Sequence, residues 1–189
     1  LERIPQLAAE FKSVFGRDSG GLIRTYRTED AETIVIAMGS VLGTIKDTVD
    51  EMRDAGHKIG VLGITSFRPF PLLEVAVALK HCKRFVVLEK SLAVGIGGIV
   101  ATNVRMAVTG MGLKGYTVVA GLGGRAITMK SLTGLFEKAG RDELEPVTFL
   151  DLDWKVVNKQ LEREREKRRT GPAAEAMLRD VGAVAARNY

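Results

Sequence analysis

Short apolar runs recur along the chain, and each is followed by a segment whose apolar positions have helical spacing. The first run covers residues 34–38 and ends directly in Gly39 and Ser40. A continuous apolar run of this length, bounded by turn residues, is typical of a strand buried on both faces. After Ser40, apolar residues recur every three or four positions as far as Met52, and Gly56 follows. This pattern predicts a helix that Ser40 caps and Gly56 ends.

The same alternation of strand and helix repeats three more times. Apolar strands about 25–30 residues apart, each followed by a helix, indicate a parallel sheet covered on both faces. We therefore predict an α/β fold: an open, mostly parallel, doubly wound sheet with a helical C-terminal extension. Further strands are predicted at 59–64, 84–89, 116–120 and, as a short last strand, 147–150, and further helices at 71–79, 99–108 and 128–138.

Three segments are expected. Residues 1–21 form a lead-in helix and linker, 22–140 the α/β domain, and 141–189 an extension with two helices. Residues 22–28 alternate apolar and polar positions, which favours an additional edge strand. An antiparallel orientation is one option for this strand. Two narrow apolar stripes run through the extension, and such helices are expected to pack on the domain or on another subunit. The stripes consist of Trp154, Val157 and Leu161, and of Ala173, Met177, Val181 and Val184.

Composition narrows the classes of protein that need to be considered. Hydrophobic residues make up 46% of the 189 residues and charged residues 27%, a globular mix. No apolar run approaches the roughly 18 residues of a membrane span, and no signal segment opens the chain, so we expect a cytoplasmic protein without a membrane partner. The chain begins at Leu1 without an initiator methionine, which suggests a piece of a longer protein.

The charge balance gives little support to nucleic-acid binding. Lys and Arg number 28 against 23 Asp and Glu, a net charge of +5 that serves solubility or an acidic partner. Residues 162–169 are all charged, but glutamates are interspersed among the basic residues and no aromatic residue stands among them. That pattern favours a solvated helix face over a phosphate-binding surface.

Candidate binding residues lie where the predicted strands end. Ligands of open parallel sheets bind beyond the carboxyl ends of the strands, beside helix N-termini whose free amides attract anions. The resulting rim is a candidate for an anion or coenzyme site, or for a subunit contact in which the arginines bond carbonyls or a neighbour's carboxylates. The rim consists of Gly39, Ser40, Arg68, Lys90, Gly123, Gly124 and Arg125.

Residues 121–126 fit the dinucleotide fingerprint G-x-G-x-x-G/A between a predicted strand and a predicted helix. The motif is not in the first βα turn, and Asp151 follows it by about 28 residues where about 20 are expected. An independent nucleotide-binding or regulatory module is therefore the alternative function. Residues 95–98 fail the pattern because Val100 occupies the last glycine position, and close packing of helix on strand explains those glycines.

Nucleophiles and metal ligands are few. The single cysteine, Cys82, excludes an internal disulfide and cannot hold an iron–sulfur cluster, which needs about four thiolates. A lone buried thiol beside His81 is expected to be inert, and His57 is expected in a solvated loop. No His, Cys, Asp and Glu set has metal-ligand spacing. We therefore expect no catalytic residue and no metal site on this chain.

Four motifs follow one another in a fixed order along the chain. They are Tyr-Arg-Thr-Glu-Asp-Ala-Glu at 26–32, the strand and turn at 34–47, Phe-Arg-Pro-Phe-Pro at 67–71 and Ala-Gly-Leu-Gly-Gly-Arg at 120–125. Together they resemble the alpha chain of the 2-oxoacid:ferredoxin (or other acceptor) oxidoreductases, the pyruvate:ferredoxin oxidoreductase family. The resemblance covers roughly residues 11–139, and the motifs are specific only in combination.

The resemblance implies a domain like the C-terminal domain of transketolase. It also implies oxidative decarboxylation of a 2-oxoacid with coenzyme A to an acyl-CoA and CO2, with electrons passed to ferredoxin or another acceptor. Thiamine diphosphate, Mg and iron–sulfur clusters are then held by other domains or chains, with a thiamine-binding beta chain and an iron–sulfur chain as partners.

The sequence from Leu1 onward does not contain the domain that the resemblance leads us to expect for the thiamine pyrimidine, and its segment after Arg141 is longer than expected. The chain is thus expected to be mainly architectural and inactive alone, with coenzyme A as a possible ligand. A pure assembly module without any ligand is the third reading.

Overall fold

The computed structural model of the chain describes residues 1–166. The chain divides into two compact units, Leu1–Asp151 and Leu152–Tyr189, and each is described by itself. The predicted division at residues 21 and 140 stays a prediction, although a strand beyond residue 140 belongs to the sheet of the first unit. Within residues 1–166, every helix is too short or too polar to cross a membrane.

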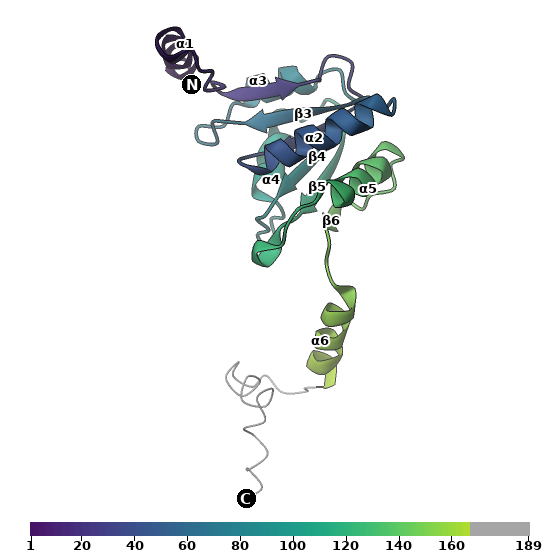
Figure 1. The fold of residues 1–189 in the computed structure, drawn as a ribbon. Helices are drawn as coiled ribbons and strands as arrows, with labels where there is room; N and C mark the ends of the chain where they lie inside the picture. Colours follow the sequence, from purple (N-terminus) through teal and green to yellow (C-terminus); the bar gives the residue numbers. More distant parts are fainter. Residues whose placement is uncertain (167–189) are drawn as a thin grey trace, which may run out of the picture. The chain divides into compact units, whose positions relative to one another are not determined.

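The first unit is built around a six-stranded sheet (Figure 1). The strand order is β1-β3-β2-β4-β5-β6; β1 runs antiparallel to β3, and the other neighbours are parallel. The elements are α1 (Arg3–Phe15), β1 (Ile23–Tyr26), β2 (Thr33–Ala37), α2 (Val41–Asp54), β3 (Ile59–Ile64), α3 (Leu72–Leu79), β4 (Arg84–Glu89), α4 (Ile99–Ala107), β5 (Lys114–Val119), η1 (Leu122–Gly124), α5 (Met129–Gly140) and β6 (Val147–Phe149).

Alternate residues of each central strand enter two separate cores. Val35 and Ala37 of β2 lie in a core with α2 and α5, whereas Ile34 and Ile36 lie in a core with α3 and α4. Because side chains of a strand alternate between faces, a strand that is apolar at every position serves a helical layer on each side. The predicted α/β class and the mostly parallel sheet are confirmed, as is the antiparallel edge strand.

One sequence prediction about a helix start is wrong. Ser40 stands at the N-cap of α2, but its hydroxyl makes no cap hydrogen bond. Its backbone is already helical, with φ −65° and ψ −25°, whereas a capping side chain reaches back from an extended backbone. A hydroxyl does cap α5, where the Ser131 amide donates to Thr128 Oγ1 at 3.2 Å.

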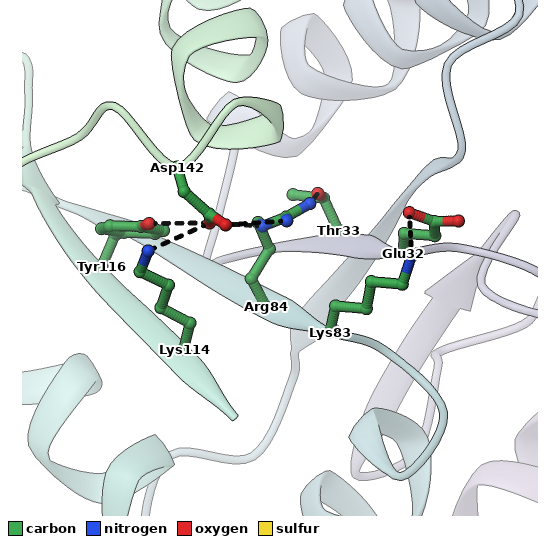
Figure 2. Close-up of polar contacts among 7 residues, drawn as sticks. All are labelled: Glu32, Thr33, Lys83, Arg84, Lys114, Tyr116 and Asp142. Carbon is green, nitrogen blue, oxygen red and sulfur yellow. Dashed lines mark hydrogen bonds and ion pairs between the residues drawn. The ribbon is translucent and has the colours of Figure 1, made fainter. Parts of the chain in front are cut away.

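An ion-pair network ties the amino-terminal ends of the central strands to the end of α5 (Figure 2). The Asp142 carboxylate accepts from Arg84 Nε at 2.9 Å and Nη2 at 3.2 Å, and from the Tyr116 hydroxyl at 3.0 Å. Arg84 Nη1 also donates to Thr33 Oγ1 on β2 at 3.2 Å. The Arg84 guanidinium is the main reason that the pKa of Asp142 lies below its usual 3.8. The Asp142 carboxylate, just after the end of α5, thus binds β4 and β5 directly and reaches β2 through Arg84.

The edge strand β6 is short and follows a proline. The Thr117 amide of β5 donates to the Pro146 carbonyl at 2.9 Å, and only residues 147–149 continue the pairing.

The second unit begins with α6 (Trp154–Glu166). Asp153 caps it, since its Oδ1 accepts from the amides of Lys155 and Val156 at 3.0 and 3.3 Å. The first predicted stripe of the extension lies on this helix. The end of the charged run at Arg169 and the second stripe, from Ala173 onward, fall outside the described residues.

Candidate functional site

A pocket of about 410 Å³ lies at the carboxyl edge of the sheet, where β2 and β4 are neighbours. From β2 the chain crosses through α2 to β3 on one side, and from β4 it crosses through α4 to β5 on the other. The two connections diverge onto opposite faces, and such a switch point leaves a crevice between them. The lining residues are Met38, Gly39, Ser40, Val41, Phe67, Leu88, Glu89, Lys90, Ser91, Ile99, Val100, Ala120 and Ile127.

A carboxylate holds one wall of this pocket in place. Glu89, the last residue of β4, is only 8% exposed. Its two oxygens accept from backbone amides of the first turn of α4, from Val100 at 2.9 Å and from Ala101 at 3.0 Å. Two of the amides that could attract an external anion at α4 are therefore already bonded to a side chain of the protein.

Gly98 makes this anchor possible. A Cβ on residue 98 would overlap the Glu89 carboxylate and would also stand 2.8 Å from Thr117 Cγ2. Its φ of −70° is ordinary, so space rather than backbone conformation requires glycine here. The interpretation that close packing explains the glycines at 95–98 is confirmed for Gly98. It is wrong for Gly95 and Gly97, whose Cβ positions have nothing within 4 Å and whose positive φ is the reason for glycine.

Three residues of the predicted rim line the pocket: Gly39, Ser40 and Lys90. Gly39, with φ +78°, turns the chain from β2 into α2. The Lys90 ammonium makes no hydrogen bond or ion pair with any part of the chain that the structure describes. Lys90 is therefore a cation at the pocket mouth that is free to meet a ligand or a neighbouring chain.

Arg68 stands beside the pocket without lining it. Its guanidinium lies 4.0 Å from the ring centroid of Phe67, which does line the pocket. Nη1 donates to the Phe67 carbonyl at 2.8 Å and to Asn103 Oδ1 at 3.3 Å. These contacts leave part of the planar donor group available at the surface.

The glycine-rich end of the rim lies farther from the pocket. Gly123, Gly124 and Arg125 are exposed and are not among its lining residues. Arg125 Nη1 donates to the carbonyl of Asp151, which follows β6. This contact matches the alternative in which an arginine of the rim bonds a backbone carbonyl.

The dinucleotide motif lacks the geometry of a nucleotide-binding turn. In that motif the last small residue packs the start of the helix closely against the sheet. Here Ala126 is exposed, and α5 begins at Met129 after the cap Thr128. The glycines instead form a 3-10 turn, in which Gly123 has φ +64° and Gly124 φ +78°.

Cys82 has the character of a core thiol. It is 6% exposed, and its Sγ lies 3.2 Å from the Leu79 carbonyl. Burial raises its pKa to about 11. Among residues 1–166, no group of three His, Cys, Asp or Glu side chains could hold a metal ion.

Neither the role of Glu89 nor the aromatic and aliphatic walls of the pocket were predicted from the sequence. A carboxylate that ends an otherwise apolar strand was the available signal for Glu89, since a buried charge needs partners. Its partners come 11 and 12 residues later, beyond any local motif.

Comparison with known proteins identifies the family. The profile of the pyruvate:ferredoxin oxidoreductase core domain II matches residues 31–132, from the turn before β2 to the start of α5. The chain belongs to this family. The family resemblance of the four ordered motifs is thereby confirmed, and the matched segment contains the whole pocket lining.

Relatives of the family support the same assignment. The chain is 40% identical over 161 residues to pyruvate synthase subunit PorA of Methanosarcina barkeri, covering 80% of this chain and 40% of that subunit. It is 36% identical over 138 residues to ketoisovalerate oxidoreductase subunit VorA of Pyrococcus horikoshii, covering 71% and 34%. The chain spans about two fifths of the length of the first of these relatives.

One solved structure is similar to this chain at a lower sequence identity than the subunits named above. It is a 2-oxoglutarate:ferredoxin oxidoreductase from Magnetococcus marinus with 2-oxoglutarate, coenzyme A and succinyl-CoA bound. The TM-score is 0.48 at 16% identity, covering 68% of this chain and 21% of that one.

Proposed function

We propose that this chain is part of the alpha subunit of a thiamine-diphosphate-dependent 2-oxoacid oxidoreductase complex of the cytoplasm. In the overall reaction a 2-oxoacid and coenzyme A give an acyl-CoA and CO2, and an electron pair passes to ferredoxin or another acceptor as a proton is released. The observation that carries the proposal is the 40% identity to a pyruvate synthase subunit over 161 residues.

Within that complex the chain is mainly architectural. Its donor set does not fit an iron–sulfur cluster, because the sequence contains one cysteine. Nor does the described part of the chain offer a cluster of carboxylates and imidazoles for a divalent cation. Thiamine diphosphate, Mg and the iron–sulfur clusters therefore belong to other domains or chains, which include a thiamine-binding beta chain and an iron–sulfur chain.

The rim at the carboxyl edge is the part of this chain that meets the rest of the complex or its coenzyme. Arg68, Lys90 and Arg125 supply positive charge there, and Gly39, Ser40, Gly123 and Gly124 bring backbone close to the surface. Lys90 lines the pocket and is unpaired within residues 1–166, which supports a contact with an anionic group, either of coenzyme A or of a partner subunit.

Purification of the tagged chain from cells that make the complete complex tests the assignment. We expect the chain to copurify with thiamine-diphosphate-binding and iron–sulfur subunits in constant stoichiometry, with 2-oxoacid- and coenzyme-A-dependent reduction of an electron acceptor. A monomer that turns over substrate alone would contradict the proposal. So would saturable NAD(H) binding by the isolated chain, which the nucleotide-module alternative requires.

Replacement of Lys90 by glutamine separates the two roles of the rim. For a coenzyme contact, Lys90→Gln raises the KM for coenzyme A by up to about fivefold, the size of an exposed charge interaction. For a subunit contact, it lowers the fraction of chain found in the complex and leaves the KM unchanged. Lys130→Gln, which removes an exposed lysine of α5 outside the pocket, is the matched control.

A further inference from the structure

The loop between β4 and α4 carries a tight turn, residues 92–96, which we call the knob. The amides of Ala93 and Gly97 each donate to the other residue's carbonyl at 2.8 Å, and the Ile96 amide donates to Ala93 O at 3.0 Å. Gly95 and Gly97 have φ of +82° and +91°, which side-chain-bearing residues rarely adopt. Hydrogen bonds between Ala93 and the residues at 96 and 97 therefore fix the backbone that carries Val94 and Ile96.

The fixed backbone presents apolar side chains to the surface. Val94 is 99% exposed, Ile96 68% and Leu92 41%, and Leu122 in the loop after β5 is 47% exposed. From Ser91 to Val104 the sequence has no charged residue. A rigid loop that holds apolar side chains in solvent marks an interaction site, because burying them in a partner is favourable and costs little ordering.

Positive charge lies at the same edge of the sheet as this apolar surface. The loops that follow β2, β3, β4 and β5 carry Arg68, Lys90 and Arg125 and contain no carboxylate. Glu89 ends β4 at the same edge, but it is buried and bonded to two amides of α4. Ser91 and Ile99, which flank the knob, line the same pocket as Lys90 and Phe67, and Phe67 carries Arg68 on its ring.

We propose that the knob inserts into an apolar hollow on another subunit of the complex, and that carboxylates border that hollow opposite Lys90, Arg68 and Arg125. An apolar anchor with a complementary charged border is the usual anatomy of a protein interface. The inference rests on the proposed function, since it requires that the chain works in an assembly. It extends that function by naming the contact and the chemistry of the partner surface.

A single engineered thiol tests the contact. Cys82 is the only cysteine of the chain, and it is buried with a raised pKa, so Val94→Cys introduces one reactive thiol. The variant is purified both as the isolated chain and as the complex, and each is treated with a maleimide. Glu51→Cys, on the exposed charged face of α2, is the control.

We expect maleimide to modify the Val94→Cys thiol at least tenfold more slowly in the complex than in the isolated chain. The Glu51→Cys thiol should react at the same rate in both. If the complex forms and the Val94→Cys thiol reacts equally fast in both, the knob proposal is wrong and the proposed function stands. If no complex forms with the unmodified chain, the proposed function itself fails.

A charge placed on the knob gives a second measurement. Val94 is fully exposed, so Val94→Asp should leave the urea unfolding midpoint of the isolated chain unchanged while it reduces retention in the complex at least tenfold. Val94→Thr keeps the branched shape and should retain most of the assembly. Full assembly of the Val94→Asp variant would overturn the proposal.

Discussion

The Glu89 carboxylate fills the space that a Cβ atom on residue 98 would need. Because the same carboxylate accepts the amides of Val100 and Ala101, it cannot move aside without losing those hydrogen bonds. One side chain thereby fixes the distance between β4 and α4 and, with it, one wall of the pocket.

The substitution Gly98→Ala should destabilise the fold by about 1–3 kcal/mol, the usual cost of overpacking. The backbone at residue 98 is ordinary for alanine, so the loss comes from the clash with Glu89 and Thr117. Urea denaturation of the isolated chain measures it. Gly134→Ala is the control: it lies exposed within α5 with nothing near its Cβ position, and should raise stability by up to about 1 kcal/mol. Equal effects of the two substitutions would refute the steric argument.

Neutralising the buried carboxylate should also be costly. Glu89→Gln keeps the shape, but its amide nitrogen is a donor and cannot accept the second helix amide. We expect a loss of about 1.5–3 kcal/mol in the free energy of unfolding, the range for hydrogen bonds to a charged group. Amide hydrogen exchange at Val100 and Ala101 should accelerate more than exchange in α2. Unchanged protection at these two amides would show that the bonds contribute little.

The Asp142 network predicts a loss of stability in acid. Since Arg84 chiefly lowers the pKa of Asp142 below 3.8 in the folded chain, folding favours the ionised carboxylate. Its contribution is fully present above the unfolded value of 3.8 and is lost as pH falls through the lower folded value. The stability difference between the wild type and Asp142→Asn should therefore shrink as pH falls from 7 to 2, measured by urea denaturation.

A matched variant isolates that effect from general acid denaturation. Asp47 is exposed on α2, and its carboxylate makes no hydrogen bond or ion pair with residues 1–166. Asp47→Asn should leave the stability close to that of the wild type, because that carboxylate has no partner to lose. If the stability difference between the wild type and Asp142→Asn stays constant with pH, the Asp142–Arg84 ion pair does not cause the loss of stability in acid.

The buried thiol should resist alkylation in the native chain. With its pKa raised from 9.0 to about 11, the thiolate fraction of Cys82 at pH 8 falls about 100-fold. Iodoacetamide should therefore modify the native chain at least about 100 times more slowly than the urea-unfolded chain. Rapid modification of the native chain would mean that the helix end around Cys82 opens readily.

Sequence pattern alone predicted most of the fold because each element carries its own local signal. The apolar runs of β2, β3 and β4 are buried at nearly every position, as parallel strands covered on both faces must be. The alternation at 22–28 likewise identified the antiparallel edge strand β1. These signals depend only on neighbouring residues.

Features that depend on distant residues were not predictable. The pairing of Glu89 with α4 and the position of Phe67 in the pocket wall require the tertiary arrangement. For the same reason the rim was only partly brought together: Gly39, Ser40 and Lys90 share a pocket, whereas Arg125 turns to the carbonyl of Asp151. The prediction that Ser40 caps α2 was wrong because the residue type shows capping potential but not the backbone angles that capping needs.

The short final strand β6 limits aggregation of the chain when the chain is synthesised without partner subunits. A foreign strand can extend a sheet only along a row of free amides and carbonyls, and β6 offers three residues preceded by a proline that has no amide hydrogen. The opposite border, β1, is only four residues long. Edge-to-edge pairing of the sheets of two molecules is thus disfavoured at both edges, which protects a newly synthesised chain from fibrous aggregation.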